Sequence, residues 1–283
     1  MPLVLITGPN RGLGKVLAQS FWEHGYSLLL VGRSPSTWEA MGKPLAFKDG
    51  QSLQLMSADL SVPSEVMTLC EQLERHTEPI SVLVNNAAIQ GPIGPAWTGN
   101  IADWVTTIQV NLLTPVALCR AVIPGMIARG SGSIINLSGG GAAGSRANFS
   151  AYATAKTGLV RFSETLADEA KSHGVKVNCV APGAMKTAML GQVLSTGEIA
   201  SGTREFEIAK KVFLDGGASM DRVAQLALFL ASKKSDGLTG KLISAVWDDW
   251  ENWPQHLQEL ASSDVYTLRR IVGKDRGFTW GDK

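Results

Sequence analysis

Short runs of apolar residues alternate with longer stretches of helical periodicity along most of this chain. The apolar runs are rich in Leu, Ile and Val, which is typical of strands buried on both faces, as in a parallel sheet. Strands are predicted at Leu3–Thr7, Ser27–Gly32, Ser52–Ala58, Ser81–Asn85, Ser133–Leu137, Val175–Ala181 and Lys241–Ala245. Helices are predicted between them at Gly12–His24, Ser64–His76, Ile101–Arg129, Ala151–Ser172 and Asp221–Ser232.

This alternation of strands and helices indicates an α/β fold. Strand–helix–strand repeats with right-handed crossovers build a doubly wound, Rossmann-like parallel sheet with helices on both faces. We therefore expect one dinucleotide-binding and catalytic domain over residues 1–245. Residues 182–217 are long and weakly periodic, which predicts a mobile flap over a site. The aromatic extension at 246–283, which holds VWDDWENW, is expected to pack on the domain rather than to form a second one.

Composition narrows the class of protein. The chain has 283 residues and a net charge of +1 with no basic run, which argues against nucleic acid as the main partner. Cys70, Cys119 and Cys179 are far apart and the four histidines are scattered, so neither a metal site nor a disulfide is expected. No apolar run approaches the roughly 20 residues of a membrane span, and a strand begins by Leu3. We expect a cytoplasmic protein without membrane contact.

A glycine-rich loop opens the chain. TGPNRGLG at 7–14 places Gly8, Gly12 and Gly14 between an apolar strand and a helix. Glycine permits a tight turn and close backbone approach, and the helix N-terminus offers free N–H groups to a pyrophosphate. No Lys-Ser or Lys-Thr follows the loop glycine, as a phosphoryl-transfer loop requires. The loop therefore predicts dinucleotide binding.

The end of the second predicted strand indicates which dinucleotide binds. NAD sites usually carry an Asp or Glu there, which accepts hydrogen bonds from the ribose 2′-hydroxyl. Here Gly32 and Arg33 follow the apolar run, and Arg11 in the first loop is a second cation nearby. Guanidinium groups suit a 2′-phosphate through paired, charge-assisted hydrogen bonds. NADP(H) is therefore favoured over NAD(H).

Tyr152 and Lys156, in SAYATAK, are the candidate acid/base pair. Four residues on a helix correspond to about 6 Å of rise and the same face. An ammonium group held there stabilises a phenolate, which would make the phenol, with an ordinary pKa near 10, an acid/base closer to neutral pH. Such a pair is common by chance, so its weight comes from the glycine loop before it.

These residues together resemble the short-chain dehydrogenase/reductase family over about residues 2–245. TGPNRGLG at 7–14, Asp59-Leu60, NNAA at 85–88, Asn111, YATAK at 152–156 and PGAMKT at 182–187 stand in the family's order and spacing. The resemblance implies a catalytic Tyr152 and Lys156, with Asn111 holding a proton-relay water. Together with the loop and strand end, it implies cofactor contacts from Gly8, Asn10, Arg11, Gly12, Leu13, Gly14, Arg33, Asp59, Leu60, Asn86, Ala87, Tyr152, Lys156, Pro182, Gly183 and Thr187.

Ala88 stands where the family has a glycine, and a second departure from the family's pattern bears on catalysis. The family usually has a serine 13 residues before the tyrosine, which hydrogen-bonds the substrate oxygen, and here Gly139 stands there. Ser138 is one residue earlier, and neighbouring strand residues point to opposite faces. Three alternatives remain open: Ser138 serves through a shift of the glycine-rich loop, a loop residue such as Ser145 serves, or there is no such donor.

The resemblance implies an NADP(H)-dependent oxidoreductase that interconverts a secondary alcohol and a carbonyl of a small molecule. It also implies a homodimer or homotetramer, commonly paired through the helices here at 101–129 and 151–172, unless the C-terminal extension blocks or redirects such contacts. The alternative is a nucleotide-binding sensor or scaffold with little turnover, for which Gly139 is the only support. The substrate's identity does not follow from the sequence.

Overall fold

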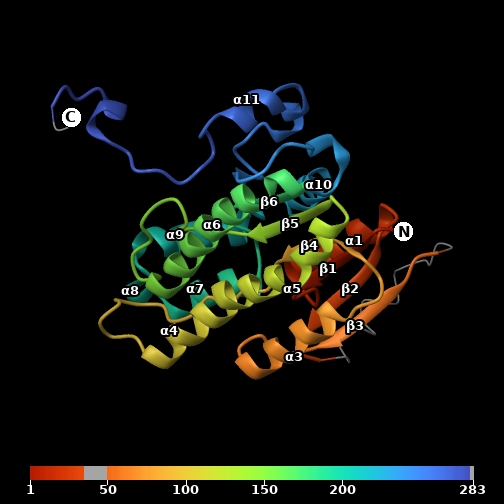
Figure 1. Ribbon diagram of the computed structural model, residues 1–283. Helices are drawn as coiled ribbons and strands as arrows, with labels where there is room; N and C mark the ends of the chain where they lie inside the picture. Colours follow the sequence, from red (N-terminus) through yellow and green to blue (C-terminus); the bar gives the residue numbers. More distant parts are fainter. Residues whose placement is uncertain (35–49, 281–283) are drawn as a thin grey trace.

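The centre of the molecule is a parallel sheet with the strand order β3-β2-β1-β4-β5-β6-β7 (Figure 1). The computed structural model describes residues 1–34 and 50–280. The strands in this part of the chain are β1 (Leu3–Thr7), β2 (Ser27–Gly32), β3 (Leu53–Ser57), β4 (Ile80–Asn85), β5 (Gly132–Leu137), β6 (Val175–Ala181) and β7 (Leu242–Ser244). The predicted fold class is confirmed, and the strand ends differ from the prediction by at most one residue.

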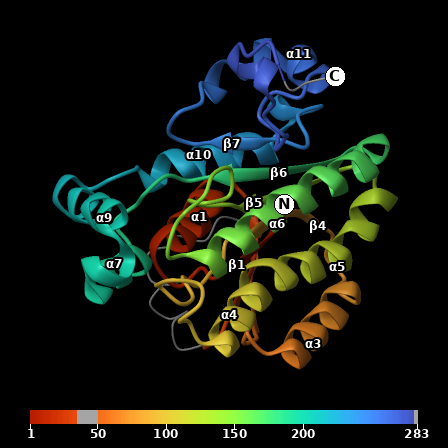
Figure 2. The ribbon, with the colours of Figure 1, turned by 90° about the vertical axis from the view of Figure 1, so that its left-hand side faces the viewer.

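Helices cover both faces of the sheet (Figure 2). The main ones are α1 (Gly12–Glu23), α3 (Pro63–Glu74), α4 (Ile101–Ile108), α5 (Thr114–Ala128), α6 (Ser150–Ala170) and α10 (Met220–Ala231). Side chains of α1 and α10 share one apolar core with the sheet, and those of α3, α5 and α6 share a second core on the opposite face. Because each face is covered, the strands are apolar almost throughout, as their sequence indicates.

The strand order places a topological switch point between β1 and β4. Successive strands run from β1 toward β3 on one side and from β4 toward β7 on the other. The loops that follow β1 and β4 therefore leave the sheet in opposite directions and open a crevice at its carboxyl edge, where ligands bind in such folds. The glycine loop follows β1, and NNAA spans the end of β4.

The predicted helix at 101–129 is interrupted. A π-helical turn, η1 (Gln109–Leu113), separates α4 from α5. The whole stretch Ile101–Ala128 is long and apolar enough to cross a membrane by length and composition, although no single apolar run in it is that long. Half of its most apolar window is buried inside the protein, and the core helices of globular proteins meet the same criteria.

The flap is helical rather than irregular. Between β6 and α10 lie α7 (Ala188–Thr196), α8 (Glu198–Ser201) and α9 (Thr203–Asp215). Weak periodicity hid them, because Gly197 and Gly202, with φ of 85° and 84°, break the segment into short pieces. Figure 2 shows α7 and α9 at one end of the molecule, at the side of the sheet.

The C-terminal extension is only partly packed. Trp250 and Trp253 of η4 (Trp250–Gln255), together with Leu260 of α11 (Leu257–Ser262), are buried in the core that α1 and α10 share. In contrast, Trp247 and Trp280 are 86% and 73% exposed, so the aromatic content of the tail did not predict burial throughout. In Figure 1 the last part of the chain, around η5 (Gly273–Arg276), lies away from the sheet.

The tail is held on one side of β7. The backbone N–H of Leu242 donates to the carbonyl oxygen of Tyr266 at 2.8 Å, and buried Lys241 donates to the carbonyls of Ser263 and Val265. The backbone N–H of Leu268 donates to a carboxylate oxygen of Glu164 on α6 at 2.6 Å. The tail therefore covers the free edge of β7 and part of α6.

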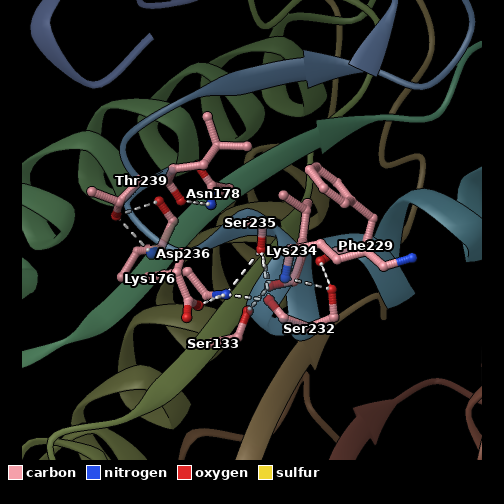
Figure 3. A network of polar contacts seen from close by, with 12 residues as sticks. Ser133, Lys176, Asn178, Phe229, Ser232, Lys234, Ser235, Asp236 and Thr239 are labelled. Atoms are coloured by element: carbon pink, nitrogen blue, oxygen red, sulfur yellow. Dashed lines mark hydrogen bonds and ion pairs between the residues drawn. The ribbon is translucent and has the colours of Figure 1, made fainter. Parts of the chain in front are cut away.

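A polar network around Lys176 joins the chain after α10 to β6 (Figure 3). The Lys176 ammonium donates to the carbonyl oxygen of Ser232 at 2.6 Å, to Ser235 Oγ and to a carboxylate oxygen of Asp236, both at 2.9 Å. The Asn178 amide donates to the carbonyl oxygen of Leu238 at 2.8 Å. These bonds position the turn that η3 (Lys233–Ser235) begins and that leads into β7.

Candidate active site

The glycine loop is fastened to the end of β4. The backbone N–H groups of Asn86 and Ala87 both donate to Thr7 Oγ1, and the Asn86 side chain donates to the carbonyl oxygens of Thr7 and Gly8 at 3.0 and 3.1 Å. A Cβ at Gly14 would stand 2.0 Å from the Gly8 carbonyl oxygen. Only glycine therefore permits α1 to begin so close to the loop, with its N-terminal N–H groups facing the crevice.

The crevice has the features of a dinucleotide site. A cavity of about 410 Å³ lies between the loop, the chain after β4 and α7, and Arg11, Gln90 and Gln192 are among its lining residues. Gln90 Nε2 and, in the glycine loop, Asn10 Oδ1 are buried without a hydrogen-bond partner among residues 1–34 and 50–280. Unpaired buried polar atoms are costly, so they indicate a ligand that pairs with them. The residues present fit a nicotinamide dinucleotide.

Arg33 and Asp59 lie together beyond the ends of β2 and β3. Ser61 donates to Asp59 Oδ1 through its backbone N–H at 2.9 Å and its hydroxyl at 2.6 Å. These bonds, and to a lesser extent the Arg33 charge, hold the pKa of Asp59 below its usual value. Arg33 itself is exposed, and Leu60 is buried with its carbonyl bonded to Thr114. An exposed guanidinium at this strand end is free to reach a 2′-phosphate.

Asn111 lies inside the π-helical turn and is fully buried. Its side-chain amide donates to the carbonyl oxygen of Ile89 at 2.8 Å and accepts from the Ile89 backbone N–H at 2.9 Å. Both side-chain groups of Asn111 thus hold the chain after NNAA in place. A π turn changes which backbone carbonyls are paired, and such turns are frequent at functional sites.

Tyr152 stands directly over Gly139. It is on the first turn of α6 and only 7% exposed, with the flap side chains Met189, Leu190 and Val193 in the same apolar cluster. A Cβ built at Gly139 would lie 2.4 Å from the Tyr152 hydroxyl oxygen. The phenol oxygen therefore occupies space that any larger residue at this position would need.

The two serines that the sequence offered differ in position. Ser138 is buried and its backbone N–H donates to the carbonyl of Val180, while its hydroxyl oxygen has no hydrogen-bond partner in the described part of the chain. Ser145 is exposed on the loop before α6. Of the two, only Ser138 has an unpaired hydroxyl inside the protein, at the end of β5 and beside Gly139.

Lys156 is buried one turn further along α6. Its ammonium donates to the carbonyl oxygen of Leu137 at 2.7 Å and lies 5.8 Å from the centre of the Tyr152 ring. The side chain is 2% exposed, and this burial lowers the pKa of Lys156 to about 8. The lysine is thus still protonated at neutral pH, close to its titration point.

Burial also determines the direction in which the pKa of Tyr152 shifts. Desolvation under the flap raises the pKa of Tyr152, and the charge of Arg146 opposes this increase. The sequence-based expectation of a phenol made more acidic by Lys156 is therefore not met in the protein chain by itself. The reason is the apolar cover of α7, which disfavours a phenolate.

Lys156 makes a test of this burial possible. The pKa of Lys156 has its usual value of 10.5 in the unfolded chain and is about 8 in the folded protein. Between pH 8 and 10.5, the unfolded chain therefore binds more protons than the folded protein. Stability therefore rises with pH through this window, by about 3 kcal/mol in total. We expect the free energy of unfolding of the wild type, minus that of Lys156→Met, to increase from pH 7 to 10 in urea titrations. Exposed Lys233→Met is the control, and an equally flat difference for both variants would contradict the burial of Lys156.

The segment after β6 closes the crevice from the flap side. Pro182 is buried. Gly183 has a φ of 81°, and a Cβ at this position would lie only 2.7 Å from Cγ2 of Val246, so a side chain does not fit here. Thr187 begins α7, where its hydroxyl oxygen accepts from the backbone N–H of Leu190 at 3.3 Å. Its methyl group would be 3.5 Å from a Cβ at Gly12, so the flap reaches the glycine loop.

Two residues near this crevice were not predicted from the sequence to lie there. Gln90 lines the cavity, and Arg146 lies beside Tyr152 with Glu205 of the flap as its partner. Neither stands in a motif, and nothing in the local pattern distinguishes them from ordinary loop residues. Only the packing of distant segments brings them to the site.

Comparison with known proteins agrees with this geometry. A family profile described as short chain dehydrogenase matches residues 2–197. A 3-oxoacyl-(acyl-carrier-protein) reductase of Chlamydia muridarum is 32% identical over 241 residues, which cover 85% of this chain and 94% of that protein. A putative NAD(P)-dependent gluconate 5-dehydrogenase from Beutenbergia cavernae, solved with NADP at low occupancy, is 27% identical with a TM-score of 0.74, and the match covers 86% of this chain and 94% of that one. An NAD⁺-bound xylitol dehydrogenase, at 20% identity and a TM-score of 0.76, shares the fold over 86% of this chain and 96% of that one.

The fold and the crevice define an oxidoreductase that uses a nicotinamide cofactor and acts on a CH–OH or C=O group. The chain belongs to the short-chain dehydrogenase/reductase family, as the sequence motifs indicated.

Proposed function

We propose that this protein is an NADP(H)-dependent oxidoreductase that interconverts a secondary alcohol and a carbonyl, with Tyr152 as the acid/base. The observation that carries the proposal is the position of the phenol oxygen over Gly139 at the end of β5, with the Lys156 ammonium 5.8 Å from the ring. Both groups lie at the carboxyl edge of the sheet, where the glycine loop and NNAA open the crevice.

Each residue has a defined part in the proposed reaction. The cofactor supplies or accepts the hydride. Tyr152 gives its proton to the substrate oxygen during reduction and takes it back during oxidation. Lys156, protonated below about pH 8, stabilises the tyrosinate that results. The unpaired hydroxyl of Ser138 is the best-placed donor for the substrate oxygen among the serines considered, because Gly139 has no side chain.

The glycine loop, Asp59, Leu60, Asn86, Ala87 and the segment from Pro182 to Thr187 would hold the cofactor. Arg33, with Arg11, would hold the 2′-phosphate of NADP(H), and no acidic residue occupies the strand end to favour NAD(H). The NADP named with the Beutenbergia cavernae structure is consistent with this preference.

A carbonyl panel tests the activity. The panel holds simple ketones, sugar-derived ketones and a 3-oxoacyl thioester, the last because of the name of the Chlamydia muridarum relative. We expect NADPH oxidation with at least one of them.

The second candidate function, a sensor or scaffold, is favoured by the position of Gly139 and by the buried phenol. Tight NADPH binding without turnover of any carbonyl or alcohol would support it.

The cofactor preference depends on Arg33. Arg33→Asp is expected to lower kcat/KM for NADPH relative to NADH by about tenfold or more, because a charge-assisted bond is replaced with repulsion. Arg75→Asp, at the exposed residue that follows α3, makes the same change in net charge away from the crevice and is the control. An unchanged NADPH-to-NADH ratio in Arg33→Asp would refute the assignment.

We further propose a homodimer or homotetramer of this chain. The helices at 101–129 (α4 and α5) and 151–172 (α6) are the surfaces that the family commonly uses, but the tail contacts Glu164 and Arg161 on α6. Removal of the tail after Ala261 uncovers this part of α6 and should therefore change the oligomeric state; an unchanged state would contradict assembly through that part of α6. Sedimentation velocity of both chains distinguishes these outcomes.

A further inference from the structure

Arg146 lies between the phenol and the flap. It comes from the loop before α6, and its Nε and Nη2 atoms are both 2.8 Å from Oε2 of Glu205 on α9. The guanidinium carbon is 3.8 Å from the centre of the Phe149 ring and 5.7 Å from the centre of the Tyr152 ring. One cation thus contacts the flap and the face of an aromatic ring next to the phenol.

This ion pair is largely shielded from water. The side chains of Arg146 and Glu205 are 13% and 17% exposed, whereas the exposed Lys210–Glu207 pair on the same helix is 50% and 57% exposed. Charges that are removed from bulk water are screened much less by solvent and salt than those at the surface. The field of Arg146 therefore reaches the Tyr152 ring with little attenuation.

Among the residues that the structure describes, few other charges face Tyr152. Helix α7, the strand β5 and the residues 86–100 carry no titratable side chain, although they surround the phenol. Lys156 lies behind the ring on α6, and Glu205 faces it from α9 through Arg146. Arg146 is the charge that lowers the pKa of Tyr152. The balance between Arg146 and Glu205 is therefore expected to dominate the electrostatics on this side of the phenol.

The flap and the phenol are also joined by packing. Ala209 of α9 and Val193 of α7 belong to the same buried cluster as Phe149 and Tyr152. The side chain of Asn148 is beside Gly202, at the start of α9, and its backbone carbonyl accepts from the N–H of Gly94. The loop that carries Arg146 is thus positioned by the flap on one side and by the chain after β4 on the other.

We propose that Arg146 is a positioning residue of this reaction: held by Glu205 of the flap, it supports negative charge on the Tyr152 oxygen as a second cation beside Lys156. This inference depends on the proposed acid/base function of Tyr152 for its catalytic meaning. The electrostatic coupling itself does not, and it can be measured without turnover.

The direct test is the titration of the phenol. The chain has three tyrosines, Tyr26, Tyr152 and Tyr266, so ¹³C labelling at tyrosine Cζ yields three resolvable NMR signals. Tyr152→Phe assigns one of them, and the other two serve as internal references. Circular dichroism at each pH restricts the titration to folded protein.

Two substitutions are expected to move the Tyr152 midpoint in opposite directions. Glu205→Gln removes a negative charge and keeps an oxygen acceptor for Arg146, so the midpoint should fall by about one pH unit. Arg146→Met removes the cation, so the midpoint should rise, and Arg146→Lys should remain near the wild type. The pKa of the wild-type phenol is already raised, so a further rise is harder to measure in folded protein than a fall. The lower midpoint expected for Glu205→Gln is therefore the decisive measurement.

Arg222→Met is the matched control. Arg222 also pairs with a glutamate, Glu251, and lies 5.4 Å from an aromatic ring, that of Trp250, in the other core. The Arg222→Met substitution should leave the titration midpoint of Tyr152 unchanged. A Glu205→Gln midpoint equal to that of the wild type would overturn the inference, and so would a shift in the same direction for Glu205→Gln and Arg146→Met, which would indicate loosened packing.

Kinetics separate this inference from the proposed function. Alcohol oxidation needs the tyrosinate, so the rate rises with pH through the Tyr152 pKa, and this limb should move to lower pH in Glu205→Gln. If the NMR midpoint moves but no alcohol or carbonyl is turned over, the proposed function fails and the coupling stands. If turnover is normal and the midpoint does not move, the coupling fails and the proposed function stands.

Discussion

Tyr152→Phe is expected to lower kcat for carbonyl reduction by about a thousandfold or more, while NADPH binding stays close to that of the wild type. The phenol is the proposed proton donor, and general acid catalysis contributes roughly 10²–10⁴-fold. Phenylalanine keeps the ring that packs with Phe149 and Val193, so the apolar cluster remains filled. Steady-state kinetics and NADPH fluorescence titration measure the two effects separately.

Tyr26→Phe is the control for the loss of a hydroxyl. Tyr26 packs edge-on against Phe21 at the start of β2, in the core formed by α1 and α10. It should retain normal turnover. Normal activity of Tyr152→Phe would remove the assigned acid/base, and loss of NADPH binding together with turnover would show that the residue acts through the cofactor site instead.

Gly139→Ser is expected to lower activity by about a hundredfold, although it introduces the serine that the family usually has. Its Cβ would lie 2.4 Å from the Tyr152 hydroxyl oxygen and 3.1 Å from Cε1 and Cζ. The ring would have to move, but it is enclosed by side chains such as Phe149 and Val193, both fully buried. A displacement of about 1 Å in a reacting group can cost a hundredfold in rate.

Two further variants identify the cause. Gly139→Ala adds the same Cβ without a hydroxyl, so an equal loss in Ala and Ser variants would assign the effect to sterics. Ser138→Ala removes the unpaired buried hydroxyl and should cost on the order of 3 kcal/mol in transition-state stabilisation if Ser138 is the substrate donor. An increase in activity in Gly139→Ser would instead show that the missing serine limits catalysis.

The position of Gly139 has a consequence for the two candidate functions. Read from sequence, the glycine is a lost donor and favours a weak enzyme or a sensor. In the structure, the glycine is the residue over which the phenol oxygen lies, at a distance no side chain permits. The same departure from the family's pattern is thus compatible with an active site in which Tyr152 is placed closer to β5.

Much of the fold followed from the sequence because its signals are local. Apolar runs such as Leu3–Thr7 are buried on both faces of the sheet. The glycines of the first loop are needed because the backbone there has a positive φ or no room for a Cβ, and this depends on residues close in sequence. The helices of the flap were not predicted, because Gly197 and Gly202 divide it into helices too short for a clear period. Exposure of Trp247 and Trp280 could not be inferred, since aromatic content does not determine which rings find a partner.

The sequence by itself determined the parallel α/β fold and the family, and it supplied the candidate residues for the chemistry, because each depends on residue type at short spacing. Only the tertiary structure decided the environment of those residues. Arg146 and Glu205 are 59 positions apart, and the contact of Leu268 with Glu164 spans 104. Burial against α7 reverses the expected shift of the Tyr152 pKa, and the burial of Lys156 beside the end of β5 lowers its pKa to about 8. Such effects arise from desolvation and from charges brought together by packing, which local sequence patterns do not encode.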